Sequence, residues 1–189
     1  MTLLVEPKLM SIEEFVALPD VTGYELVEGI LTERKTMGAR ADFVAAQITR
    51  RLGNFSEEHH AGSVFGSETT YRCFGHPNTG RRADVSFISK TRLAEEQIPD
   101  GYLDIPADLA VEVVSPNDLA YEVEAKVALY LRYDFGEVWL VYPNLGTIHV
   151  YRKGQPILTF EAEQSIVGTG PLEGFSCEVF RFFPAVAKP

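Results

Sequence analysis

The pattern of apolar and polar positions is clearest between Pro106 and Pro143. Residues 109–114 and 138–142 are short apolar runs rich in β-branched residues, which predicts two strands. Between them, the apolar positions of residues 119–133 recur at helical spacing. Because parallel strands need a long crossover connection, this order predicts two parallel strands joined by a right-handed helical crossover.

Two charged residues interrupt this apolar pattern. Glu112 lies in the middle of the first predicted strand, whose other members are apolar. Lys126 lies on the inner face of the predicted helix, three residues after Val123 and four before Tyr130. Burying an unpaired ion costs on the order of several kcal/mol, so a reason for both charges is needed. Two interpretations are open: a structural ion pair, or a site in which both charges act on a ligand.

The rest of the chain predicts further helices and strands around this unit. Ser11 and Glu14 form a capping box that opens a short helix, and Gly53 is expected to end a longer helix over residues 39–52. A helical turn is expected around residues 93–97 of a polar connection. Strands are predicted over residues 24–27 and 30–35, as a hairpin about a tight turn at Glu28 and Gly29. Further strands are predicted over residues 63–74, 82–88 and 175–180, and over 147–151 and 157–160 as an antiparallel meander. This order predicts an α/β fold, a mixed sheet flanked by helices with an antiparallel extension, in a single domain over residues 1–189 with its core at about 20–182.

Composition and charge limit the function. The chain has 189 residues and a net charge of −10, which argues against a protein that coats nucleic acid non-specifically. The charge is uneven: residues 1–92 carry 11 basic and 12 acidic side chains, and residues 93–189 carry 6 and 15. A local basic lip is conceivable from five residues of the first half, namely Arg72, Arg81, Arg82, Lys90 and Arg92.

The sequence also bears on location. No apolar run approaches the length of a membrane span, and residues 1–10 lack the features of a signal peptide. Cys73 and Cys177 form no motif spacing. We therefore expect a cytoplasmic protein with unreactive thiols.

The candidate chemistry centres on two acids and a lysine. Asp84 lies near the start of the predicted strand 82–88, Glu112 lies in the next strand, and Lys126 lies on the helix that follows. Two carboxylates on adjacent strands suit Mg²⁺, which prefers one or two carboxylates together with water and phosphate oxygens. A nearby ammonium can orient water or stabilise developing charge, so the set suits metal-assisted phosphodiester hydrolysis. The open alternative for Asp84 is a simple ion pair with Arg81 or Arg82.

Weaker candidates stand beside this set. Glu25 is a possible auxiliary carboxylate, although a half-exposed position on the hairpin is the better expectation. Cys73 and His76, with His59 and His60 upstream, resemble metal ligands only loosely. The sequence contains no P-loop, dinucleotide-binding or serine-hydrolase motif. The aromatic residues of the central unit are expected in the core rather than on a base-stacking surface.

Five segments in this order resemble the Uma-two family of uncharacterised bacterial proteins, which is expanded in cyanobacteria. They are YELVEG at 24–29, RADV at 82–85, PADLAVEVVSP at 106–116, KVALY at 126–130 and EVWLV at 137–141. The resemblance runs from Tyr24 to Phe180, and its most specific part is the VEVVSP…K…Y…VWLV block. It implies a restriction-endonuclease-like fold of the PD-(D/E)XK type.

The resemblance also implies roles for particular residues. Asp84 matches the motif Asp and Glu112 matches the (D/E) position, with the backbone carbonyl of Val113 as a further metal ligand. The family pattern would place the lysine at position 114, which is valine here, and Lys126 on the next helix takes its place. The implied protein is a Mg²⁺- or Mn²⁺-dependent nuclease acting on nucleic acid, with DNA expected and a homodimer as the expected assembly. The alternative is a catalytically degenerate binding or scaffold module of the same fold.

Overall fold

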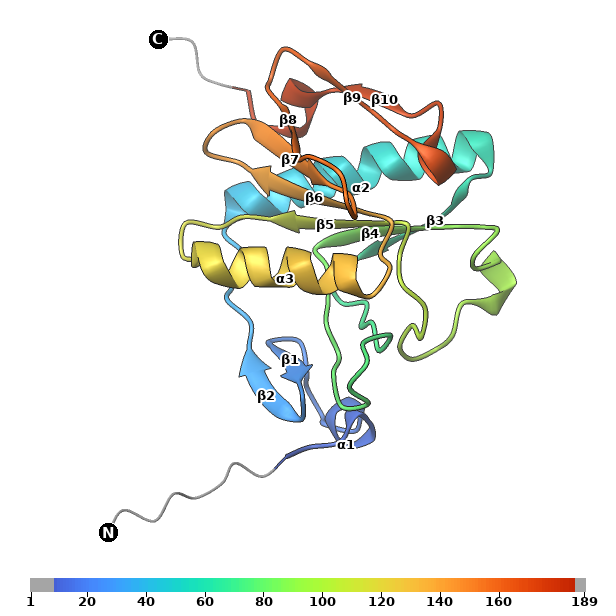
Figure 1. The fold of residues 1–189 in the computed structure, drawn as a ribbon, viewed down its shortest axis with the longest axis vertical. Coiled ribbons are helices and arrows are strands. Elements are labelled where there is room, and N and C mark those ends of the chain that lie inside the picture. The colour runs from blue at the N-terminus through green and yellow to red at the C-terminus, as the bar shows by residue number, and fades with distance from the viewer. Residues whose placement is uncertain (1–8, 186–189) are drawn as a thin grey trace.

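The computed structural model describes residues 9–185, whose core is a six-stranded mixed sheet (Figure 1). The strands follow the order β3-β4-β5-β6-β7-β8. They are β3 (Gly62–Gly66), β4 (Val85–Ser89), β5 (Leu109–Val113), β6 (Glu137–Tyr142), β7 (Thr147–Tyr151) and β8 (Leu158–Phe160). Residues 1–8, part of the segment without signal-peptide features, lie outside the described residues. Along residues 9–185, no helix combines the length and apolar character needed to cross a membrane.

The predicted crossover unit is present. β5 and β6 pair in parallel, with Leu109 opposite Glu137 and Val113 opposite Val141, and α3 (Ala120–Arg132) connects them. The other pairs in the sheet are antiparallel, and β6, β7 and β8 form the predicted meander. The α/β fold class predicted from the sequence is therefore confirmed.

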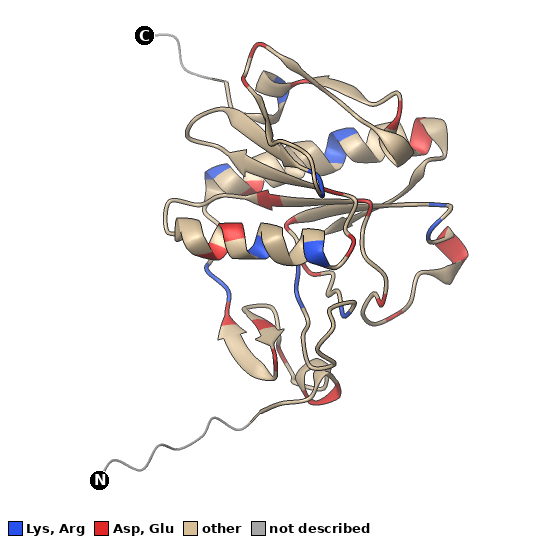
Figure 2. Cartoon of the chain, viewed as in Figure 1, with Lys and Arg blue, Asp and Glu red and all other residues tan. Residues whose placement is uncertain are grey.

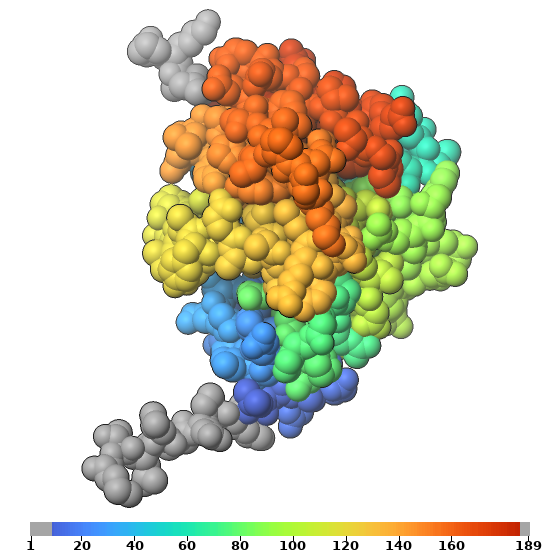
Figure 3. All heavy atoms as spheres, in the orientation of Figure 1, coloured from blue at the N-terminus to red at the C-terminus, as the bar shows by residue number. Residues whose placement is uncertain are grey.

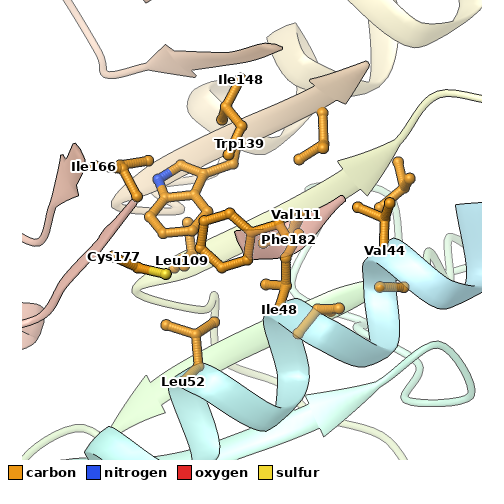
Figure 4. Packing of buried hydrophobic residues seen from close by; sticks show 14 of the residues in the cluster. Val44, Ile48, Leu52, Leu109, Val111, Trp139, Ile148, Ile166, Cys177 and Phe182 are labelled. Atoms are coloured by element: carbon orange, nitrogen blue, oxygen red, sulfur yellow. The ribbon is translucent and has the colours of Figure 1, made fainter. Parts of the chain in front are cut away.

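The two faces of the sheet are covered by different helices. The side chains of β5 alternate, so that Val111 packs in one apolar cluster and Ala110 in the other. α2 (Ala39–His59) covers the first face, where Ile48 packs among the buried residues shown in Figure 4. α3 covers the second face with Val127 and Tyr130. Odd-numbered residues of β5 therefore face α2, and Glu112 faces α3.

A small N-terminal unit lies against the sheet. The capping box predicted at Ser11 and Glu14 is present and opens α1 (Ile12–Val16). β1 (Tyr24–Val27) and β2 (Ile30–Glu33) form the predicted hairpin. Its two-residue turn, Glu28 and Gly29, has positive φ angles of 51° and 83°, as such hairpins require. Figure 1 shows this hairpin below α3, on the side of the sheet where Glu112 faces.

Five predicted boundaries are wrong, the smallest error being the second hairpin strand, which ends at Glu33 and not at residue 35. The helix predicted to end at Gly53 continues to His59, because Phe55 beyond the glycine is buried against Phe175. The strand predicted over 63–74 ends at Gly66, because Tyr71 leaves the sheet and bridges Arg81. The strand predicted from residue 82 begins at Val85. The strand predicted over 175–180 is shorter, since its end becomes a 3₁₀ helix.

The remaining elements are short. The expected turn around residues 93–97 is the 3₁₀ helix η1 (Glu95–Gln97). β9 (Ser165–Val167) pairs with β10 (Ser176–Glu178), with η2 (Gly170–Leu172) between them and η3 (Val179–Phe182) after them. The sequence analysis did not predict β9.

Candidate active site

Glu112 and Asp84 meet where β4 and β5 separate. The backbone N–H of Asp84 donates to the carbonyl of Val111 (3.0 Å). The backbone N–H of Val113 in turn donates to Oδ2 of Asp84 (2.7 Å). Just before the start of β4, the Asp84 carboxylate therefore accepts the backbone N–H of Val113 in place of a carbonyl from a neighbouring strand. This places Asp84 beside the buried Glu112.

Lys126 from α3 points at Glu112. Its Nζ donates to both carboxylate oxygens of Glu112, at 2.9 and 3.1 Å, and to the backbone carbonyl of Arg82 (3.2 Å). One helical turn later, the hydroxyl of Tyr130 donates to Oε1 of Glu112 (2.8 Å). The ion pair that the sequence left open exists, and Tyr130 adds a neutral donor to it.

Glu25 belongs to the same cluster. The expectation of a half-exposed hairpin residue is wrong, because Glu25 is only 4% exposed. It accepts hydrogen bonds from the Arg82 backbone N–H (2.8 Å) and from the Arg81 side chain (3.0 Å). It also lies 3.6 Å from Nζ of Lys126. The hairpin is fixed in this position because Leu26 pairs with Gly80.

These groups line one cavity of about 390 Å³. Asp84, Glu112 and Val113 come from the sheet, Lys126 from α3, and Glu25 from the hairpin. The segment after β2 and the N-terminal half of α3 form the other walls. Across these walls, Lys35 and Glu122 form an ion pair of 2.7 Å. Figure 3 shows the hairpin packed directly beneath α3.

Burial and mutual repulsion shift the protonation of the acids. Burial raises the pKa of Glu112 to about 7; Lys126 lowers it, and the charges of Asp84 and Glu25 raise it. Burial also raises the pKa of Asp84, partly offset by Lys126. For Glu25, burial is outweighed by Lys126, Arg81 and the Arg82 N–H, so its pKa is lowered.

Lys126 remains charged in this environment. Burial by itself lowers the pKa of an ammonium, but the charges of Glu112, Glu25 and Asp84 outweigh it and raise the pKa of Lys126. Its side chain is 21% exposed. Lys126 is thus a partly buried lysine whose neighbouring carboxylates favour its charged form.

The donor set is compatible with Mg²⁺. No group of three or more His, Cys, Asp or Glu side chains within residues 9–185 is arranged as a metal site. Mg²⁺ does not require such a group, because one or two carboxylates with water and phosphate oxygens suffice. Asp84 and Glu112 are two repelling carboxylates on the same cavity, and a cation between them would relieve that repulsion. The residues present therefore fit this ion.

The basic lip considered in the sequence analysis is largely neutralised. Four of its five members form ion pairs: Arg72 with Asp104, Arg81 with Glu25, Arg82 with Glu68, and Arg92 with Asp108. Figure 2 shows acidic and basic segments interspersed on the visible part of the chain. Cys73 is a free cysteine whose pKa is raised by burial to about 12, so it is not poised as a metal-binding thiolate.

Two residues of the site, Tyr130 and Arg34, were not predicted from the sequence. Tyr130 was expected only as a core aromatic, and its ring is fully buried, but its hydroxyl holds Glu112. Its position four residues after Lys126 was a signal that both share a helix face. Arg34 lines the cavity 3.8 Å from Asp84, and no motif in the sequence marked it.

The fold is the mixed α/β fold of the restriction-endonuclease-like class. The chain belongs to the Uma2 family, described as "putative restriction endonuclease", which it matches over residues 12–180. A comparison with curated proteins gave no match. Among solved structures, the chain is similar to a "putative nuclease belonging to DUF820" from Anabaena variabilis ATCC 29413. The TM-score is 0.79 and the identity 18%, covering 92% of this chain and 97% of the other.

These comparisons confirm the family predicted from the sequence segments. The likeness in structure establishes the fold, and the family description supports a nuclease and hence a nucleic-acid substrate.

Proposed function

We propose that this protein is a Mg²⁺- or Mn²⁺-dependent endonuclease that hydrolyses phosphodiester bonds of DNA. The observation that carries the proposal is the convergence of Asp84, Glu112 and Lys126 on one cavity. Three different elements contribute these groups, and two of the three are buried carboxylates with raised pKa values. Clustered groups with perturbed pKa values in a cavity are typical of catalytic sites.

In this proposal Asp84, Glu112 and the backbone carbonyl of Val113 hold the cation, with Glu25 as an auxiliary carboxylate. When bound, the cation would act as a Lewis acid towards the phosphodiester. The protein contributes by fixing the carboxylates: Val113 orients Asp84, and Tyr130 orients Glu112. Both are held before any ligand arrives, which limits the reorganisation that binding costs.

Lys126 positions the attacking water. Nζ of Lys126 now bonds to both carboxylate oxygens of Glu112, and these bonds would weaken if Glu112 held a cation. Nζ would then donate to water or to a phosphate oxygen. The water oxygen would form a bond to phosphorus as the bond to the leaving sugar oxygen breaks, with the water giving up one proton to solvent and the leaving oxygen taking one from solvent. The charge comes from α3, because the position two residues after Glu112, where the family pattern would place the lysine, is Val114.

A catalytically degenerate binding module is the second candidate. Two observations favour it: both carboxylate oxygens of Glu112 are engaged by Lys126, and the protein carries a net charge of −10. Such a protein would bind nucleic acid or another partner without cleaving it.

Cleavage assays separate the two candidates. Supercoiled plasmid and single-stranded DNA are incubated with the wild type in Mg²⁺, in Mn²⁺ and in EDTA. Metal-dependent cleavage is expected for the wild type and for Glu163→Gln, which removes an exposed acid outside the cavity. Glu112→Gln is expected to be inactive. Absence of cleavage by the wild type in both metals, or activity retained by Glu112→Gln, would contradict the proposal.

We also propose a two-fold homodimer, because nucleases that cut both strands often act as two-fold dimers and two-fold pairs are the commonest oligomers. Light scattering at micromolar concentration tests it. The mass of a monomer under those conditions would contradict this assembly.

A further inference from the structure

The cavity is lined by one arginine, Arg34, that makes no close ion pair within the described residues, in contrast to the other basic side chains of the cavity. Arg34 follows β2, and its side chain is only 17% exposed. Three other cations line the same cavity, and each makes a close ion pair. Those pairs are Lys126 with Glu112 (2.9 Å), Arg81 with Glu25 (3.0 Å) and Lys35 with Glu122 (2.7 Å).

The contacts of Arg34 are weaker. One guanidinium nitrogen, Nη1, donates to the backbone carbonyl of Ser67 (3.2 Å). Its nearest carboxylates, Glu68 and Asp84, lie at 3.7 and 3.8 Å. Charge-assisted hydrogen bonds to carboxylates measure about 2.7–2.9 Å, so both contacts fall outside that range. Within residues 9–185, the guanidinium of Arg34 therefore makes one hydrogen bond, although it carries five donors.

The unused donors of Arg34 are accessible. Among the described side chains, the fully buried nitrogens without a partner belong to Arg51 and Arg81 and not to Arg34. Because Arg34 also lines the cavity, its remaining N–H groups are placed to meet a ligand there.

A second group in the cavity has no partner. Ser115 follows β5, is only 8% exposed, and lines the cavity together with Glu112 and Val113. Its Oγ makes no hydrogen bond to the described part of the chain. A buried hydroxyl without a partner costs about 1–3 kcal/mol. The oxygen is enclosed in its present rotamer, so a rotation of the Ser115 side chain towards the cavity would both expose it and give it a ligand as partner.

We propose that Arg34, with Ser115, binds a phosphate of the substrate backbone on entry to the cavity. A guanidinium matches the geometry of phosphate oxygens and is less strongly hydrated than an ammonium, which suits a largely buried position. Asp84 lies beside it, so a phosphate held by Arg34 is delivered next to the proposed metal ligands. The inference rests on the proposed function, and it assigns Arg34 to substrate binding rather than to the hydrolytic step.

Binding measured without cleavage tests the proposal. The probe is a fluorescein-labelled single-stranded DNA of about 12 nucleotides, titrated by anisotropy against the full chain in EDTA. Arg34→Met is expected to weaken binding about 10- to 100-fold, as the loss of charged hydrogen bonds does. Arg34→Lys is expected to recover part of this loss, because lysine restores the positive charge but not the planar arrangement of guanidinium donors that matches two phosphate oxygens. The matched control is Arg40→Met, an exposed arginine outside the cavity, which should change affinity less than about two-fold.

Salt dependence distinguishes phosphate contact from a structural role. For single strands, each phosphate contact contributes about 0.7 to the slope of log affinity against log salt. Arg34→Met should lower the slope by about this amount, and Arg40→Met should leave it unchanged. A merely structural Arg34, holding the Ser67 carbonyl, would lower the thermal midpoint without altering the slope. If Arg34→Met does not fold, Arg34→Lys and Ser115→Ala carry the test, each with at least about three-fold weaker binding expected.

The outcomes separate this inference from the proposed function. A wild type that cleaves DNA, together with an Arg34→Met protein of unchanged affinity and salt slope, overturns the role of Arg34 and leaves the nuclease standing. A wild type that neither binds nor cleaves overturns both. In the metal-supplemented assay, Arg34→Met should raise KM about as much as it weakens binding while kcat changes less than about three-fold. A fall in kcat alone would overturn the assignment to binding.

Discussion

At the scale of single residues, Lys126 lies among more negative charge than it can neutralise. Its Nζ is 2.9 Å from Glu112 and 3.6 Å from Glu25, and Asp84 also acts on it. Two arginines offset part of the other acids' charge, since Arg81 pairs with Glu25 at 3.0 Å and Arg34 lies 3.8 Å from Asp84. The pKa of Glu112 is nevertheless raised to about 7, first by burial and then by the charges of Asp84 and Glu25, although a lysine is bonded to it. A buried acid in this state favours the uptake of a proton or a cation.

Replacing Lys126 with Met tests its role in hydrolysis. The change keeps a chain of similar length and removes the charge, so we expect cleavage to be abolished while metal binding is retained. Leaving Glu112 without its partner should lower the free energy of unfolding by about 3–5 kcal/mol near pH 8. The loss should be smaller near pH 5, where Glu112 can take up a proton.

The control for this change is Lys153→Met. Lys153 pairs with Asp134 at 2.8 Å, but the two side chains are 67% and 78% exposed. This variant should retain both cleavage and stability, because exposed pairs contribute little. A Lys126→Met protein that cleaves as fast as the wild type would remove the lysine from the mechanism.

The raised pKa of Glu112 predicts how stability depends on pH. The folded value is about 7, against 4.5 as the ordinary value. Between these values the folded protein binds more protons than the unfolded chain, so the stabilising effect present below pH 4.5 is lost as pH rises towards 7. The raised pKa of Asp84 acts in the same direction.

Glu112→Gln should reduce this decline, by at most about 3 kcal/mol between pH 4.5 and pH 7. Chemical denaturation at several pH values measures the free energy of unfolding of both proteins, with Glu163→Gln as the control. Parallel curves for the wild type and Glu112→Gln would mean that Glu112 titrates near its ordinary pKa.

At the scale of elements, locally encoded features were predictable and features set by distant contacts were not. The capping box, the hairpin turn and the crossover helix each follow from residues close together in the sequence. The predicted end of α2 was wrong because the prediction relied on Gly53, which is only a local stop signal. Phe55, two residues later, packs against Phe175 with ring centroids 5.5 Å apart, and this contact carries the helix onward.

Two glycine substitutions test whether a glycine is a local stop signal or is required by a contact with a distant part of the chain. A Cβ at Gly53 meets nothing within 4 Å, so Gly53→Ala should stabilise the protein by about 0.5–1 kcal/mol through helix propensity. A Cβ at Gly136, between α3 and β6, would lie 2.7 Å from the backbone oxygen of Asp108. Gly136→Ala should therefore destabilise by about 1–3 kcal/mol, because β6 must shift away from β5. Thermal unfolding of both variants measures this, and a destabilised Gly53→Ala would contradict an uninterrupted α2.

At the scale of the whole molecule, the site residues that the sequence predicted are those on the strands and helix of the sheet core. Asp84, Glu112 and Lys126 stood out because each breaks an apolar pattern or begins a strand. Glu25 and Arg34 did not, because they reach the cavity only after the hairpin docks beside the sheet through the pairing of Leu26 with Gly80. That docking joins residues about fifty positions apart, and no local spacing encodes it.

The stability of the whole protein can report cation binding without any measurement of catalysis. A cation that binds the folded protein and not the unfolded chain stabilises the fold by mass action. At ten times the dissociation constant the gain is about 1.4 kcal/mol, which for a chain of this size corresponds to about 3–5 °C in Tm. We expect Mg²⁺ to raise Tm of the wild type by about this amount, relative to NaCl of the same ionic strength.

Asp84→Asn should remove this rise in Tm. An asparagine oxygen can still accept the hydrogen bond from the Val113 N–H, so the local backbone is kept while the charge is lost. Glu163→Gln should retain the rise, since Glu163 is exposed and lies outside the cavity. The control matters because a net charge of −10 attracts divalent ions to the whole surface. Equal Mg²⁺-induced shifts in the wild type and in Asp84→Asn would place the bound ion on that surface and not between Asp84 and Glu112.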